Sequence, residues 1–96
     1  MKINELLRQK REEVLKLAHQ HGASRVRVFG SVAKGEDTES SDLDLLVEME
    51  PGRSLLDLVA IKQDLEELLG CKVDVVTEAS VSPYLRERVL NEAIGL

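Results

Sequence analysis

Aromatic residues are almost absent from this chain of 96 residues, which has no tryptophan and only Phe29 and Tyr84 as rings. Proteins that bind single-stranded nucleic acid stack bases on aromatic side chains, so this mode of binding is excluded. Basic residues are also in the minority, because 13 Lys and Arg stand against 18 Asp and Glu, a net charge of -5. A surface of this sign does not attract a polyanionic duplex. Nucleic acid is therefore not expected as a standing partner.

Cysteine and long apolar runs are equally scarce. The single cysteine, Cys71, cannot form an internal disulfide, and its place in a strand-like segment favours a small buried side chain. Charges interrupt the N-terminal segment every few positions, so it holds neither a signal-peptide core nor a membrane span. We expect a cytoplasmic protein with no membrane partner. The length suits one domain, 1–96, with one modest core.

Helical and strand-like segments alternate along the chain. Helices are predicted where aliphatic residues recur every three or four positions, and strands where they alternate with polar residues. The predicted helices span residues 4–21, 54–70 and 82–92, with one short turn at 31–35 and a polar loop at 36–41. The predicted strands span 25–29, 42–48 and 71–77. This order indicates an α/β (α+β) fold, a small mixed sheet of three to four strands with helices packed on one face.

Strand parity places acidic side chains on the other face of this sheet. Leucine and valine alternate with Asp42, Asp44 and Glu48 in the second strand, and valine alternates with Asp74 in the third. A helix connects these two strands, and such a crossover joins parallel neighbours. Asp42, Asp44 and Asp74 therefore converge on one end of one face.

Three carboxylates at close range repel one another, and a bound divalent cation would neutralise them. Residues i and i+2 of a strand stand about 6.6 Å apart, a spacing that suits the two-metal arrangement of nucleotidyl transfer. We therefore predict that Asp42 and Asp44 bind two Mg²⁺ ions. Asp74 would complete the site on the acceptor side and help to take the acceptor's proton.

A tight turn after the first strand supplies a place for phosphate. Gly30 has no Cβ to keep a phosphate from the backbone, and Ser31 with the following amides can donate hydrogen bonds to it. Lys34 adds a cationic contact, and Gly35 lets the chain turn away. Together with the carboxylates, the turn predicts a site for the phosphates of a nucleotide.

These residues resemble a known family. The chain is similar to the signature of the minimal nucleotidyltransferases in the DNA polymerase β-like superfamily, which is Gly-Ser, a ten-residue spacer and Asp-x-Asp. Here the signature lies in Phe29 to Gly35, with the ten residues from Val32 to Ser41 as spacer, followed by Asp42-Leu43-Asp44. The later segment 73–76 resembles that family's third acidic strand. The family has Arg more often than Lys at position 34, so a bidentate phosphate contact is not expected there.

The resemblance implies a function and a partner. Members of this size are commonly encoded beside a HEPN-domain ribonuclease toxin and act as its antitoxin, by transferring AMP from ATP to a tyrosine of the toxin. The resemblance thus implies ATP as donor, Mg²⁺ as cofactor and a toxin protein as acceptor.

Other interpretations remain open. The chain can act as a non-catalytic antitoxin that neutralises its partner by complex formation, or transfer a nucleotide to a small hydroxylated molecule. Aliphatic residues of the last segment form a candidate surface for a partner or for self-association; they are Leu85, Val89, Leu90 and Ile94. Arg25 and Arg27 are interpreted as charges that face solvent or a partner, and contact with a nucleotide is the alternative.

Overall fold

The computed structural model describes residues 2–38 and 42–96, so part of the predicted loop at 36–41 lies outside the described residues. The helices are α1 (Ile3–Gln9), α2 (Arg11–Gln20), α3 (Gly30–Lys34), α4 (Leu55–Leu69), the 3-10 turn η1 (Glu78–Ser80) and α5 (Pro83–Glu92). The strands are β1 (Ala23–Phe29), β2 (Leu43–Met49), β3 (Val73–Thr77) and β4 (Ile94–Gly95). No helix in the described ranges is long and apolar enough to cross a membrane.

The four strands form one mixed sheet in the order β3-β2-β1-β4. Strand β1 pairs antiparallel with β2 and with β4, whereas β2 and β3 run parallel. The crossover between β2 and β3 is α4, whose start is fixed by a capping box: the Ser54 side chain accepts from the Leu56 amide, and Asp57 accepts from the Ser54 amide. The predicted mixed sheet and its parallel pair are therefore confirmed.

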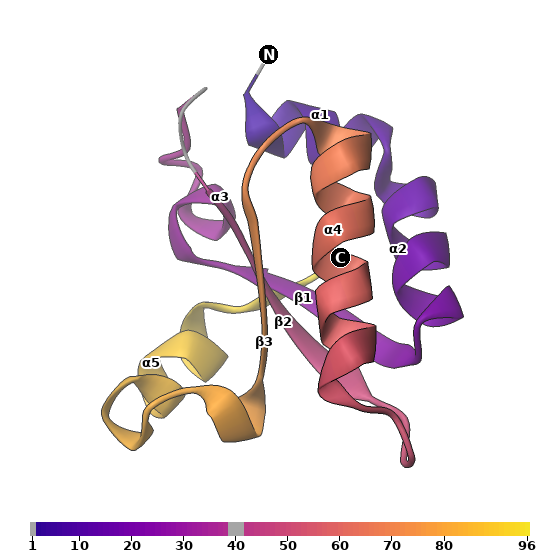
Figure 1. Ribbon diagram of the computed structural model, residues 1–96. Helices are drawn as coiled ribbons and strands as arrows, with labels where there is room; N and C mark the ends of the chain where they lie inside the picture. Colours follow the sequence, from indigo (N-terminus) through magenta and orange to yellow (C-terminus); the bar gives the residue numbers. More distant parts are fainter. Residues whose placement is uncertain (1, 39–41) are drawn as a thin grey trace.

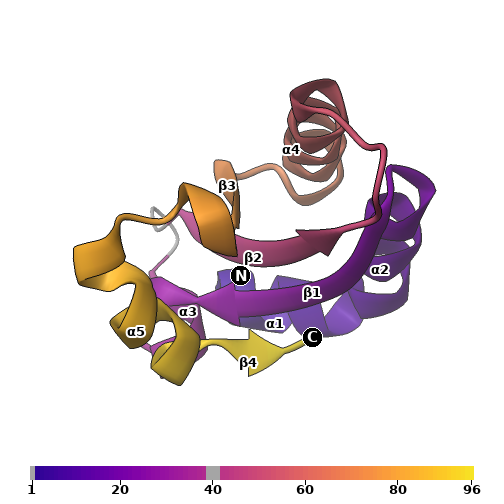
Figure 2. The same cartoon turned by 90° about the horizontal axis from the view of Figure 1, so that it is seen from below.

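One face of the sheet carries the hydrophobic core. Figure 1 shows α2 and α4 on one side of the sheet, and Figure 2 shows α1 and α2 behind β1. Strand residues that alternate along β1, β2 and β3 meet these helices, as parity predicts. The most deeply buried of them include Val26, Val28, Leu43, Leu45, Val47 and Val73. The helices bring Val14, Ala18, Ile61 and Leu65 to the same core.

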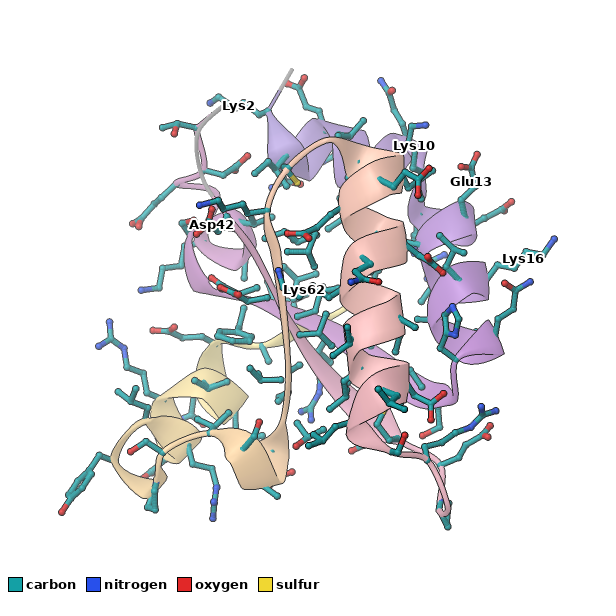
Figure 3. All side chains as sticks on the ribbon, viewed as in Figure 1. Lys2, Lys10, Glu13, Lys16, Asp42 and Lys62 are labelled. Atoms are coloured by element: carbon teal, nitrogen blue, oxygen red, sulfur yellow. The ribbon has the colours of Figure 1, made fainter. Side chains whose placement is uncertain are left out.

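The prediction of one helix over 4–21 is wrong, because the chain bends at Lys10 and forms α1 and α2 instead (Figure 3). Lys10 has φ -106° and ψ 18°, outside the helical region, although its amide still donates to Leu6 and its carbonyl still accepts from Val14. The bend lets α1 pack on α3 while α2 packs on β1 and α4. No glycine or proline lies at the bend, so no local pattern predicts it.

The end of the chain turns back onto the sheet. Helix α5 follows Ser82 and has Pro83 at its first position, as predicted, but it lies on the side of the sheet away from α2 and α4 (Figure 1). Ile94 belongs to β4 and not to the apolar strip of the last helix. On this side Leu46 is only 1% exposed, and η1 packs against β2. The face that carries the acids is therefore partly covered, not fully open as predicted.

Candidate active site

The turn at Gly30 and the carboxylate of Asp44 lie directly against each other. Gly30 has φ +75° and begins α3, and Phe29 immediately before it is the register partner of Asp44. A Cβ added to Gly30 would collide with Oδ2 of Asp44. Phe29 provides no side-chain cap, so the first amides of α3 keep their donors for other partners. The structure therefore brings the predicted phosphate turn to a predicted metal ligand.

The three predicted acids lie at the end of the sheet where β2 and β3 begin. Asp44 and Asp74 are register partners in the parallel pair, and Asp42 directly precedes β2. Figure 3 shows Asp42 at this end of the sheet. Asp42 and Asp74 are exposed, whereas Asp44 is partly buried. Burial raises the pKa of the Asp44 carboxyl, and repulsion from Asp74 and then from Asp42 raises it further. The acids therefore act on one another electrostatically.

This donor set fits a divalent cation in its chemistry. Carboxylate oxygens are the ligands that Mg²⁺ prefers, and a cation would relieve the repulsion that raises the pKa of Asp44. As the side chains stand, no group of three His, Cys, Asp or Glu residues within 2–38 and 42–96 is close enough to hold a metal ion. Convergence of the three acids on a metal thus remains a prediction, which requires their side chains to rotate inward.

Lys34 already has a partner, which the sequence did not suggest. Its Nζ lies 3.3 Å from Oε1 of Glu92 in α5, and the same oxygen accepts from Nε of Arg88 at 3.2 Å. Hydrogen bonds from Arg88 and Lys34 lower the pKa of Glu92, so this carboxylate stays ionised. A phosphate must therefore compete with Glu92 for the ammonium group of Lys34.

The sequence also did not predict a contact that joins the start of α1 to the elements of the site. Asp37 is only 3% exposed, and its Oδ2 accepts from the Asn4 amide at 3.1 Å. The side-chain amide of Asn4 donates to the Val32 carbonyl of α3 at 3.4 Å. The start of α1 therefore binds both α3 and the segment that leads toward Asp42. No sequence signal distinguished Asp37 from the other acids of a polar loop.

A glycine turn beside carboxylates on paired strands is the arrangement expected of an enzyme that acts on nucleotide phosphates. The family model of the nucleotidyltransferase domain matches residues 7–96. The chain therefore belongs to the nucleotidyltransferase domain family, and it is a nucleotidyltransferase of the minimal kind that its sequence resembles.

Similar proteins support this assignment over the full length of the chain. A candidate protein adenylyltransferase of Methanocaldococcus jannaschii is 48% identical over 96 residues, which cover 100% of this chain and 99% of the relative. The protein adenylyltransferase MntA of Thermococcus cleftensis is 38% identical over 78 residues, 81% of this chain and 79% of that protein.

Two solved structures share the fold. The structure of a candidate minimal nucleotidyltransferase superposes with a TM-score of 0.88 and 59% identity, and the match covers 100% of this chain and 97% of that one. A chain from the crystal structure of an MntA-HpeT toxin-antitoxin mutant, with a tyrosine replaced by alanine, has a TM-score of 0.73 and 25% identity. That match covers 90% of this chain and 70% of the other.

Proposed function

We propose that this nucleotidyltransferase transfers AMP from ATP to a tyrosine hydroxyl of a HEPN-domain ribonuclease toxin and thereby acts as its antitoxin. The observation that carries the proposal is the position of Asp44, which touches the Gly30 turn on one side and pairs with Asp74 on the other. Relatives named as protein adenylyltransferases and an MntA-HpeT toxin-antitoxin structure support the transfer of AMP to a protein and the antitoxin role.

Each residue of the site has a defined part in this proposal. The amides at Gly30 and the hydroxyl of Ser31 bind the phosphates that leave, and Lys34 exchanges Glu92 for one of them. Asp42 and Asp44, with Asp74, would hold two Mg²⁺ ions, which stabilise the charge that develops on the phosphates. The tyrosine oxygen forms a bond to the α-phosphorus as the bond to pyrophosphate breaks, and Asp74 accepts the phenolic proton.

A label-transfer assay tests the proposal. The chain, the protein encoded beside it, Mg²⁺ and ATP labelled at the α-phosphate are incubated together, and the labelled tyrosine is located by mass spectrometry. We expect label on the partner with the wild type and none with Asp42→Ala plus Asp44→Ala. Label transfer that persists in the double variant, or its absence in the wild type with an intact partner, contradicts the proposed activity.

A second candidate function is neutralisation by binding alone. Exposed apolar side chains favour it, because Tyr84 is 95% exposed, and Leu55 and Leu56 at the start of α4 are exposed as well. The Asp42→Ala plus Asp44→Ala variant separates the two functions. Full protection of cells from the toxin by this variant supports simple binding, whereas loss of protection with retained complex formation supports transfer.

A further inference from the structure

Two arginines of β1 have the same sequence context but different environments. Arg25 and Arg27 lie on the face that carries Asp44, and a guanidinium nitrogen of each is 3.9 Å from Oε1 of Glu48. The side chain of Arg25 is 57% exposed, as expected for a surface charge. That of Arg27 is only 11% exposed. The structure thus separates two residues that the sequence treats alike.

The buried guanidinium of Arg27 lacks the partners that burial requires. Its Nε is buried and has no hydrogen-bond partner within the described residues. Within 2–38 and 42–96 its ion pair is with Glu48, which is half-exposed; this pair is long and is shared with Arg25. Buried donors are almost always hydrogen-bonded in native proteins, and a buried cation without a close anion is unfavourable. Arg27 is therefore suited to bind an anionic ligand.

The sheet register places Arg27 within reach of Asp44. Its guanidinium now lies beside Glu48, on the side away from Asp44, and must turn to approach Asp44. Arg27 is the partner of Leu46, and Phe29 is the partner of Asp44, so Arg27 is diagonal to Asp44 on one face. Diagonal neighbours stand about 7–8 Å apart, within reach of a long side chain. Gly30 follows Phe29, so Arg27 and the phosphate turn lie on opposite sides of Asp44.

We propose that Arg27 binds the α-phosphate of the nucleotide, opposite the turn that binds the leaving phosphates. This inference rests on the proposed nucleotidyl transfer and assigns one more residue to it. A planar guanidinium matches two phosphate oxygens, and the α-phosphoryl group is where charge builds as the acceptor attacks. A low-exposure cation at that point acts more strongly than one in open water.

Equilibrium binding tests the inference without any transfer reaction. Binding of α,β-methylene-ATP in Mg²⁺ is measured by calorimetry for the wild type, Arg27→Gln and the matched control Arg25→Gln, which removes the same charge from the same strand. We expect Arg27→Gln to weaken binding about 10-fold or more, because it loses a charge-assisted hydrogen bond. Arg25→Gln should change it less than about twofold, as expected for an exposed ion pair. Circular dichroism melts check that each variant is folded.

Fragments of the nucleotide locate the contact. Arg27→Gln should weaken binding of AMP but not of adenosine or pyrophosphate, which both lack the α-phosphate. Equal effects of the two arginine variants, or an equal loss for adenosine, overturn the inference while the proposed function stands. The inference is also overturned if Arg27→Gln binds the nucleotide as well as the wild type does but binds the acceptor protein more weakly, since Arg27 would then contact that protein. A wild type that binds no nucleotide contradicts the proposed function itself.

If Arg27→Gln does not fold, Arg27→Lys carries the same test. Lysine keeps the charge but offers no planar pair of donors, so Arg27→Lys should weaken binding of the analogue more than Arg25→Lys does. Identical affinities for Arg27→Lys and Arg25→Lys overturn the inference.

Discussion

Replacing Gly30 by alanine tests the central contact of the site, the close approach of the turn to Asp44. Gly30 has φ +75°, a left-handed conformation that costs an L-residue about 1–2 kcal/mol. In a domain of this size, such a loss lowers the thermal midpoint by about 4–16 °C. The new Cβ would also collide with Asp44 Oδ2, so the carboxylate must move. A displacement of about 1 Å at a reacting centre can cost about 100-fold in rate.

Gly35→Ala is the matched control, because it separates the backbone effect from the effect on Asp44. Gly35 has nearly the same φ, +72°, but a Cβ added there meets nothing within 4 Å. Both variants should lose similar stability in thermal melts. Only Gly30→Ala should lose label transfer at a temperature where both are folded. Equal transfer rates for the two folded variants would falsify the claim that transfer depends on the close approach of the Gly30 turn to Asp44.

Three further predictions concern contacts around the site. Asp44→Asn should raise the thermal midpoint of the metal-free protein at pH 7, because the raised pKa of Asp44 means that its charge is unfavourable in the fold. In thermal melts at lower pH this gain in midpoint should fade, since acid protonates Asp44 in the wild type. A gain that is constant at all pH values argues against charge as the cause. Glu92→Gln should tighten ATP binding about two- to fivefold in calorimetry by freeing Lys34, and weaker binding contradicts the competition between Glu92 and phosphate. Asp37→Ala should lower the free energy of unfolding, measured in urea, by about 1–3 kcal/mol, since the Asn4 amide loses its acceptor. Asp37→Asn should lower this free energy by less. Equal losses for the two variants refute the role of this hydrogen bond.

The strands and their pairing were predictable because they follow from alternation and connection alone. A strand whose leucines and valines alternate with acids fixes which face each acid occupies, and the helix α4 between β2 and β3 makes them parallel. The register then aligns Asp44 with Asp74. The approach of Gly30 to Asp44 follows from the same backbone, because Phe29 and Asp44 are paired.

The parts that were not predicted depend on contacts between distant segments. The bend at Lys10 arises because α1 and α2 pack on different elements, which no residue at the bend announces. Lys34 meets Glu92, 58 positions later, only because α5 returns to α3. Likewise, the 2-residue strand β4 is too short to show a period, and it forms by pairing with β1.

The difference between local patterns and contacts of distant segments also explains which functional residues the sequence can indicate. The position of Asp44 is set by strand parity, so a local pattern suffices to place it beside the turn. The role of Arg27 depends on its burial, and alternation gives Arg25 and Arg27 the same face and the same Glu48 partner. Strand β4 pairs with β1 at Arg27 and not at Arg25, so the two arginines differ in their backbone partners as well as in exposure. The sequence can suggest either arginine as a contact for a nucleotide, but only the fold distinguishes Arg27 from Arg25.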